Sequence, residues 1–484
     1  MNPQIVDITP PTTNLETGQE EKPGTNHASI GIDEQKGETT AYRQDVFGDE
    51  EFAEVKYKVL KWWQCGLLMV AETISLGILS LPAAVAGLGL IPATVILISL
   101  GLLASYTGYV IGQFKWKYPY ISSMADAGEV LMGRFGREVL FVGQMLFLVF
   151  LMASHLLTFT VAMNTLTSHA TCSIVFGIVG LIISLLISLP RTLEKMSWLS
   201  LASFISIFSA VLITMIAIAI QNTGSVVKAT AETNLVTGFT SALNIALSYA
   251  SHNTFFNMIA ELKEPKDFPK ALTLLQCIDI SLYLIAAVVI YRYAGDDVAS
   301  PALGSASPLM SKVAYGIALP TIIIAGVING HIACKSIYTR IFAGTNHMHK
   351  RDFIAIGSWI GIALGLWVIA WIISAAIPVF SSLLSLMTAL FASWFSFGLP
   401  GAFWLYLNKG QWFSSPKKIL LTIVNTICIC IGIIMCKFFM REYRYSLLDF
   451  NNKGTLTARG FLEIVMTTVN MTFVVYREPL LLVE

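Results

Sequence analysis

The chain has 484 residues, of which 55% are hydrophobic and only 13% are charged, and its formal net charge is +1. Soluble globular proteins carry about 25% charged residues, so this composition excludes a water-soluble multidomain protein and indicates a membrane protein. Without a basic stripe or an aromatic RNA-binding motif, no nucleic-acid partner is expected.

Residues 1–57 are rich in Pro, Gly, Thr, Asn and Glu and contain few aromatic residues. This composition predicts a disordered acidic tail. Residues 58–440 then alternate long apolar runs with short polar breaks, which predicts one membrane domain. Residues 441–484 form a C-terminal tail without a clear pattern.

The apolar runs predict an all-α polytopic membrane protein, because crossing a bilayer takes about 20 apolar residues per helix. Eleven transmembrane helices are expected, at residues 66–90, 91–114, 138–163, 173–190, 198–220, 235–260, 271–292, 312–334, 353–376, 379–406 and 418–440.

The first predicted helix carries features that a simple anchor does not need. Glu72 is costly at bilayer depth unless it faces protein or water. Thr73, Ser75 and Gly77 then interrupt the apolar run, and Pro82 removes a backbone donor. These residues predict a broken helix of the kind that holds substrate in transporters. The alternative is a proline kink with Glu72 near the membrane surface.

The sixth predicted helix contains a second polar interruption, from Ser248 to Thr254. Two such interruptions five helices apart match an inverted repeat with a central binding site. The alternative is that these side chains only hydrogen-bond to neighbouring helices.

Broken helices predict a ligand with two opposite charges. Half-helix N-termini suit a carboxylate and half-helix C-termini suit an ammonium group, and an amino acid carries both. Amides near Ser75, Leu76 and Gly77 are expected to hold the carboxylate, and carbonyls before Ser251 with the Tyr249 hydroxyl to hold the amine. The full set of predicted substrate-binding residues is Thr73, Ser75, Leu76, Gly77, Tyr249, Ser251, His252, Phe256 and Asn329.

Three stretches carry a resemblance to a known family: AETISLGILSLPAAVAGLGLIP, TGYVIGQFKWKYPYISSMADAGEVLMGRFGRE and SYASHNTFFNMIAELKEPKDFPKAL. Over about residues 50–440 the chain resembles the amino acid/auxin permeases, and among them the neutral amino acid permeases of filamentous fungi. The resemblance implies eleven helices in a LeuT-like five-plus-five inverted repeat with helices 1 and 6 broken, and usually proton-coupled uptake. Relatives usually have glycine before the histidine of the second motif, where this chain has Ser251.

Proton coupling needs a group near the substrate that gains and loses a proton. Glu72 is the first candidate and His252 the second, because imidazole titrates near neutral pH. His155, Asp279 and His331 also lie within predicted spans. Each taken singly is expected to be a hydrogen-bonded packing residue, and a coupling role for one of the three is the alternative. No cofactor is expected beyond a proton or sodium gradient, and no metal site, since the pair at His347 and His349 lacks a third ligand.

Lysines and arginines gather in alternate loops, nineteen on one side against three on the other. This asymmetry places the N-terminus in the cytoplasm. The sequence therefore predicts a plasma-membrane symporter that imports neutral amino acids. A vacuolar permease and a non-transporting amino-acid sensor are the alternatives. An enzyme is not expected, because neither a nucleophile elbow nor an H-E-x-x-H cluster is present.

Overall fold

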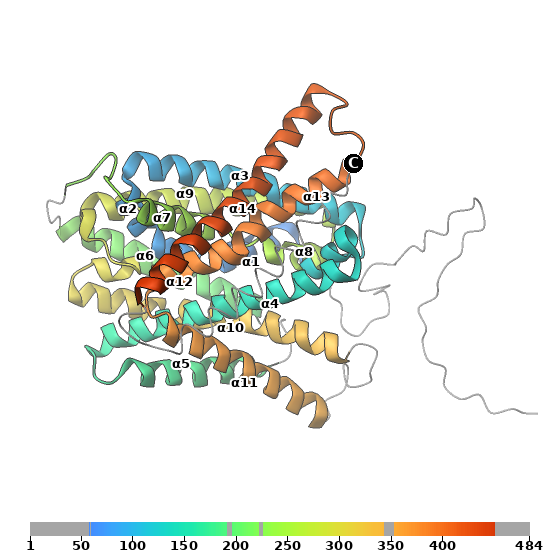
Figure 1. The fold of residues 1–484 in the computed structure, drawn as a ribbon. Coiled ribbons are helices and arrows are strands. Elements are labelled where there is room, and N and C mark those ends of the chain that lie inside the picture. Colours follow the sequence, from blue (N-terminus) through green and yellow to red (C-terminus); the bar gives the residue numbers. More distant parts are fainter. Residues whose placement is uncertain (1–57, 59, 191–195, 222–225, 343–352, 451–484) are drawn as a thin grey trace, which may run out of the picture. The chain divides into compact units, whose positions relative to one another are not determined.

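The computed structural model describes residues 58, 60–190, 196–221, 226–342 and 353–450, and these are almost entirely helical (Figure 1). The predicted tail at residues 1–57 and most of residues 441–484 lie outside the described residues. The prediction of an all-α chain is confirmed.

Each of the eleven predicted segments contains helix. The first consists of α1 (Trp62–Thr73) and α2 (Gly77–Leu88), and the sixth of α7 (Leu235–Leu247) and α8 (His252–Glu261). Eight segments each correspond to one helix: α3 (Leu90–Lys117), α4 (Met124–Thr167), α5 (Ser173–Ser188), α6 (Met196–Gln221), α9 (Phe268–Ala294), α10 (Pro308–Phe342), α11 (Phe353–Ala376) and α14 (Pro416–Phe450). The remaining segment contains α12 (Phe380–Met387), two π-helical turns at Thr388–Ala392 and Trp394–Gly398, and α13 (Leu399–Leu407).

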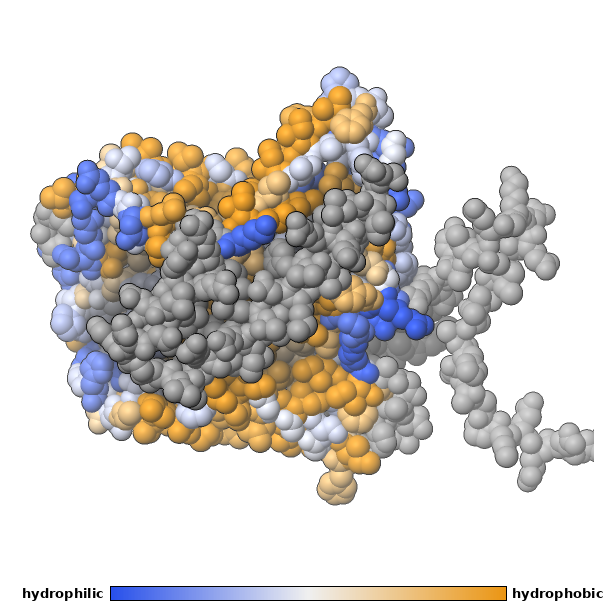
Figure 2. All heavy atoms as spheres, viewed as in Figure 1, coloured by the Kyte–Doolittle hydropathy of each residue, from blue (hydrophilic) through white to orange (hydrophobic). Residues whose placement is uncertain are grey.

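Within the described residues, eight helices are long and apolar enough to cross a membrane, or nine if the bent pair α1 and α2 counts as one span. Helix α5 is apolar but has only 16 residues, and α7 and α8 are each shorter. Figure 2 shows hydrophobic residues over much of one face, with hydrophilic residues gathered towards its two ends. The structure thus supports a multi-pass membrane protein, while the count of eleven and the repeat stay predictions.

Helix α4 differs from its predicted bounds, because it begins at Met124 and not near residue 138. Ser123 caps it: its hydroxyl accepts a hydrogen bond from the Asp126 amide at 3.2 Å, and the Asp126 carboxylate accepts one from the Ser123 amide at 3.0 Å. This capping box starts a polar stretch of helix that hydropathy does not reveal. Gly133, at φ 66°, then interrupts the helical backbone before the apolar part.

The helices differ in how deeply they are buried. Helices α4 and α10 and the segment Phe380–Leu407 are mostly buried, whereas only 28–33% of the most apolar stretch of α3, α11 and α14 is buried. Figure 1 shows α4, α10 and α11 running next to one another, and these three are in contact. Helix α9 packs against α1, α2, α3 and α6. The interrupted pairs therefore lie among other helices, which is where broken membrane helices are tolerated.

One polar contact joins two connecting segments. Lys228, between α6 and α7, forms an ion pair with Asp296 at 2.5 Å, just after α9. The hydrogen bond from Lys228 to this carboxylate raises the pKa of the ammonium group. The contact places these two connections at the same end of their helices.

Candidate functional site

The first interruption lies between α1, which ends at Thr73, and α2, which begins at Gly77, and the two axes differ by 54°. Polar side chains satisfy the backbone here: the Thr73 hydroxyl donates to the Met69 carbonyl at 2.8 Å, and the Ser75 hydroxyl donates to the Glu72 carbonyl at 3.3 Å. Pro82 lies inside α2. The bend is therefore not a kink at the proline, but a break where Thr and Ser offer the backbone other partners.

The second interruption lies between Leu247 and His252. Tight turn bonds replace the helical pattern there, from the Tyr249 amide to the Ala246 carbonyl at 3.2 Å and from the Ala250 amide to the Leu247 carbonyl at 2.9 Å. Ser251 has φ −90° and ψ 0°, a region that needs no glycine. The serine at this position is therefore compatible with an open backbone.

The two interruptions touch each other. A Cβ atom added at Gly77 would lie only 2.7 Å from the Ser248 Cα atom. Real Cβ atoms do not come so close to backbone, so glycine allows the start of α2 to pack against the end of α7. A side-chain contact adds to this, because the Thr254 hydroxyl on α8 donates to the Glu72 carboxylate on α1 at 3.3 Å.

Neighbouring helices hold both interruptions in place. On α9, the Tyr283 hydroxyl donates to the Thr73 carbonyl at 3.2 Å. On α4, the Gln144 amide donates to the Asn253 carbonyl at 3.1 Å. The end of α1 is thus anchored to α9 and the start of α8 to α4, and both α9 and α4 are continuous where these contacts form.

A cavity of about 40 Å³ lies between the two interruptions. Its walls include ends of α1, α2, α7 and α8 and side chains from α4 and α10. The lining residues are Glu72, Thr73, Ser75, Leu76, Gly77, Phe147, Leu151, Leu247, Ala250, Ser251, Asn253 and Asn329. One water needs about 10–15 Å³ by this measure, so the cavity holds about three waters. A whole amino acid requires the lining to move apart.

Three buried polar atoms of lining residues have no hydrogen-bond partner within the described part of the chain. They are the Ser251 hydroxyl oxygen, the Asn253 amide nitrogen and the Asn329 amide oxygen. Leaving a buried polar atom unpaired costs about 1–3 kcal/mol. A ligand with its own donors and acceptors would recover that cost, so the cavity is suited to a small polar molecule.

Seven predicted residues line this cavity: Glu72, Thr73, Ser75, Leu76, Gly77, Ser251 and Asn329. Sequence reasoning did not single out Asn253, although it lies in the polar run that predicted the second interruption. It also missed Phe147 and Leu151, because the sequence around them is uniformly apolar and nothing marks the face that turns inward.

Three predicted binding residues lie elsewhere. His252 faces α3, where its Nε2 atom lies 3.0 Å from both the Thr107 hydroxyl and the Ala104 carbonyl. Phe256, one turn along the same face, packs against Phe114 and Phe403 with ring centroids 6.3 and 5.8 Å away. The rotation of α8 therefore turns Asn253 to the cavity and His252 and Phe256 away from it.

Tyr249 also points away from the cavity, because its ring packs edge-on against Tyr283 at 5.4 Å. Two other intramembrane histidines have packing contacts. The Nδ1 atom of His155 lies 3.1 Å from the Ile322 carbonyl, and the His331 ring lies 5.1 Å from the Trp359 ring. The His155 contact agrees with the hydrogen-bonded packing role expected for that residue, whereas the hydrogen bond expected for His331 stays a prediction.

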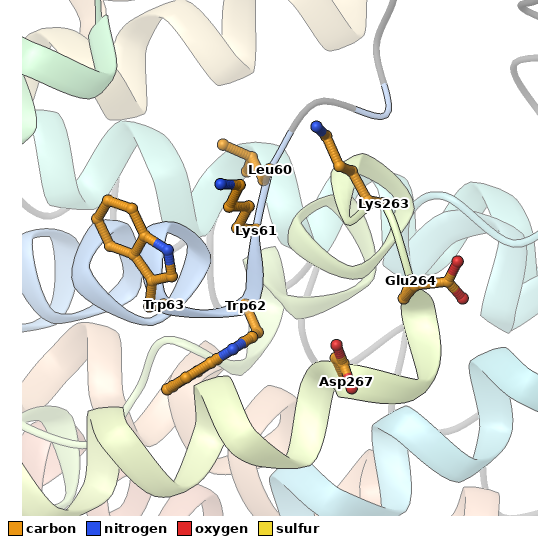
Figure 3. Close-up of a pocket in the computed structure, with 7 residues that line it drawn as sticks. All are labelled: Leu60, Lys61, Trp62, Trp63, Lys263, Glu264 and Asp267. Atoms are coloured by element: carbon orange, nitrogen blue, oxygen red, sulfur yellow. The ribbon is translucent and has the colours of Figure 1, made fainter.

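A second cavity, of about 280 Å³, lies at the start of α1 (Figure 3). Its lining residues are Leu60, Lys61, Trp62, Trp63, Lys263, Glu264 and Asp267. Backbone bonds tie its two walls together, from the Leu60 amide to the Glu261 carbonyl at 3.1 Å and from the Lys263 amide to the Leu60 carbonyl at 3.0 Å. Trp62 and Trp63 are exposed. Of these two cavities, only the smaller is lined by both interrupted helices and unpaired polar atoms, and we therefore take it as the functional site.

Residues 58–440 match the family of transmembrane amino acid transporter proteins. The chain is 36% identical over 414 residues to an N amino acid transport system protein of Neurospora crassa, covering 83% of this chain and 88% of that protein. It is 29% identical over 219 residues to amino acid transporter AVT1H of Arabidopsis thaliana, covering 42% and 48%. A solved structure of a Na⁺-coupled sialic acid symporter has a TM-score of 0.47 at 13% identity, covering 79% of this chain and 90% of that one.

Proposed function

This chain belongs to the family of transmembrane amino acid transporter proteins, and from that membership we propose that it is a proton-coupled symporter that imports neutral amino acids across the plasma membrane. The observation that carries the proposal is the cavity between α1, α2, α7 and α8. Ends of interrupted helices with opposite polarity line it, together with three unpaired polar atoms.

The charges of an amino acid fit these helix ends. The start of α2 at Leu76 and Gly77 offers backbone amides to a carboxylate, because the first amides of a helix have no partner within it. The end of α7 near Leu247 and Ala250 offers carbonyls to an ammonium group. The side chains of Ser251, Asn253 and Asn329 can both donate hydrogen bonds to the substrate and accept them from it.

The remaining walls favour a substrate whose side chain is uncharged. Phe147, Leu151 and Leu247 form the apolar part of the lining. Glu72 is the one charged residue among the lining residues, so a charged side chain on the substrate would find no fixed partner other than that carboxyl. Aliphatic and aromatic amino acids are therefore the proposed substrates.

Glu72 is the proposed proton carrier. It lines the cavity, so water or substrate can reach it, and its contact with Thr254 joins the two interrupted pairs. A change of charge on Glu72 alters this contact and so biases the arrangement of α1 against α8. His252 remains the second candidate, although it faces α3 and not the cavity. Sodium is the alternative coupling ion.

We further propose that the helices form eleven spans in a five-plus-five inverted repeat, with α1 and α2 as the first span and α7 and α8 as the sixth. Helix α5, at 16 residues, is roughly 24 Å long and needs its flanking residues to complete a span. The charge asymmetry of the loops supports a cytoplasmic N-terminus.

Uptake into proteoliposomes tests the function. Purified full-length protein is reconstituted, and accumulation of a radiolabelled neutral amino acid is measured with and without an inwardly directed proton gradient. A one-unit pH gradient sustains about a tenfold substrate gradient for one proton per substrate, or about 1.4 kcal/mol. We expect accumulation towards that limit. Uptake that ignores the pH gradient would contradict proton coupling, and the absence of exchange of any amino acid would contradict transport.

A further inference from the structure

Asp279 lies in the middle of α9 and is completely buried. Neither of its carboxyl oxygens has a hydrogen-bond partner in the ranges that the structure describes. The sequence suggested a hydrogen-bonded packing residue, and the structure contradicts this. A buried ionised carboxylate without partners is very unfavourable, and such a group is normally found in its neutral form.

Two tyrosine side chains lie near this carboxyl group. The Tyr249 ring packs edge-on against the Tyr283 ring at 5.4 Å, so both tyrosines belong to the cluster around Asp279. Tyr283 lies one turn along α9 on the same face, and its hydroxyl donates to the Thr73 carbonyl in the first interruption. Tyr249 lies in the second interruption, and its buried hydroxyl has no partner within the described residues. Asp279 therefore lies next to side chains that reach both interruptions.

Within the described residues, no cation forms an ion pair with this carboxyl group. Of the helices packed against α9, α2 and α6 carry no titratable group, and α1 carries Cys65 and Glu72. The titratable groups of α3 are Tyr106, Tyr109, Lys115 and Lys117. Those of the turns at the two ends of α9 are Lys266, Asp267, Asp296 and Asp297. The groups that interact with Asp279 are the two tyrosines, so a proton is the simplest means of neutralising it.

We propose that Asp279 is a second proton-carrying residue, occupied by a proton in this closed arrangement and emptied when the interrupted helices rearrange. This inference rests on the proposed proton-coupled transport and assigns it a residue outside the substrate cavity. In the release step the O–H bond of the carboxyl group breaks, the proton passes to water admitted by the rearrangement, and the electron pair stays on the carboxylate.

Tyr249 connects proton release from Asp279 to the second interruption, in which this tyrosine lies. Its hydroxyl lacks an acceptor now, and an ionised Asp279 is a strong acceptor for it. Loss of the proton therefore favours an arrangement in which the segment between α7 and α8 is drawn towards α9. Protonation removes that attraction and favours the closed arrangement seen here.

The test compares net uptake with exchange. Asp279→Asn keeps the size of the side chain but cannot carry a proton. In proteoliposomes we expect it to exchange external for internal amino acid within about threefold of the wild-type rate, and to lose the roughly tenfold accumulation driven by a one-unit pH gradient. Asp279→Glu, which keeps the carboxyl group, should restore part of that accumulation. Proton-driven accumulation by Asp279→Asn at the wild-type level would overturn the inference.

A second variant keeps the test decisive if Asp279→Asn fails to fold. Tyr249→Phe removes the hydroxyl that the ionised carboxylate would use, so proton release needs a lower proton concentration. We expect the pH profile of net uptake to move by about one unit to higher pH, a tenfold change in proton concentration. An unmoved profile would overturn the inference. Wild-type protein that exchanges no amino acid would instead overturn the proposed function.

Discussion

The hydroxyl of Thr254 lies 3.3 Å from the carboxylate of Glu72 and donates a hydrogen bond to it, although the two residues are 182 positions apart in the chain. Thr254 is on α8 and Glu72 is on α1, so one contact links the two interrupted pairs beside the cavity. Glu72 lines the cavity and also contacts α8, so a change in its charge can alter how α1 and α8 are arranged.

Removing the charge of Glu72 tests its role. We expect Glu72→Gln to reach the membrane at wild-type levels, because the amide keeps an oxygen that can accept the bond from Thr254. Its uptake should lose the part of the pH dependence that comes from Glu72, since no proton can bind or leave at this position. Initial uptake rates across a pH series measure this, and an unchanged profile would remove Glu72 from the coupling mechanism.

Thr254 provides a pair of matched variants. Thr254→Val keeps the shape of the side chain but loses the donor, and a single hydrogen bond contributes about 1 kcal/mol. We expect its transport efficiency, kcat/KM, to fall by about fivefold. Thr254→Ser keeps the hydroxyl and should stay close to wild type. A loss in Thr254→Ser as large as that in Thr254→Val would contradict this role, because serine keeps the hydroxyl.

The close approach of Gly77 to Ser248 predicts a strong effect of a single methyl group. Gly77→Ala places a Cβ atom 2.7 Å from the Ser248 Cα atom, and such overpacking costs about 1–3 kcal/mol. We expect transport to fall at least about tenfold. Gly361→Ala in α11 is the control, because its Cβ atom would meet nothing within 4 Å. Uptake is measured for both variants and corrected for their abundance at the cell surface. Normal transport by Gly77→Ala would show that the interruptions do not stay in contact.

The unpaired amide of Asn253 is expected to bind substrate. Asn253→Ala removes a donor from the cavity wall, so KM should rise by about five- to tenfold, the effect of one hydrogen bond. Asn257→Ala is a suitable control, since Asn257 also carries an unpaired polar atom but is not among the residues that line the cavity. If both variants change KM alike, the effect comes from α8 as a whole and not from the site.

The native cysteines offer a test of orientation. Cys172 is exposed between α4 and α5, on the side proposed to face the exterior, while the exposed Cys277 and Cys430 lie within helices α9 and α14. We expect a membrane-impermeant maleimide to label intact cells, and Cys172→Ser to abolish that labelling. Labelling that appears only after the cells are permeabilised would contradict the proposed orientation at the plasma membrane.

Much of the fold could be predicted from the sequence, because a helix that crosses a bilayer must be apolar along its length. Hydropathy found a helix in each of the eleven segments and polarity found both interruptions. It missed the start of α4, where the Ser123 capping box begins a polar stretch of helix. It placed the first interruption between Glu72 and Pro82, and the break falls within that stretch, between Thr73 and Gly77.

The candidate site could be predicted only in part. The sequence shows which residues interrupt a helix, but not how the following helix is rotated. Phe256 packs against Phe403 on α13 and so helps to set the rotation of α8, which turns Asn253 inward and His252 outward. Likewise, the sequence predicts that Asp279 is intramembrane, but only the packing of α9 shows that its carboxyl group has no hydrogen-bond partner within the described residues.

A cryo-electron microscopy map of the full-length protein with a saturating neutral amino acid tests the binding site most directly. We expect density for the amino acid between the two interruptions, with its carboxylate at the start of α2 near Gly77, its ammonium group near Ala250, and its side chain against Phe147 and Leu151. Density for the amino acid elsewhere, or α1 running unbroken into α2 and α7 into α8, would contradict this account.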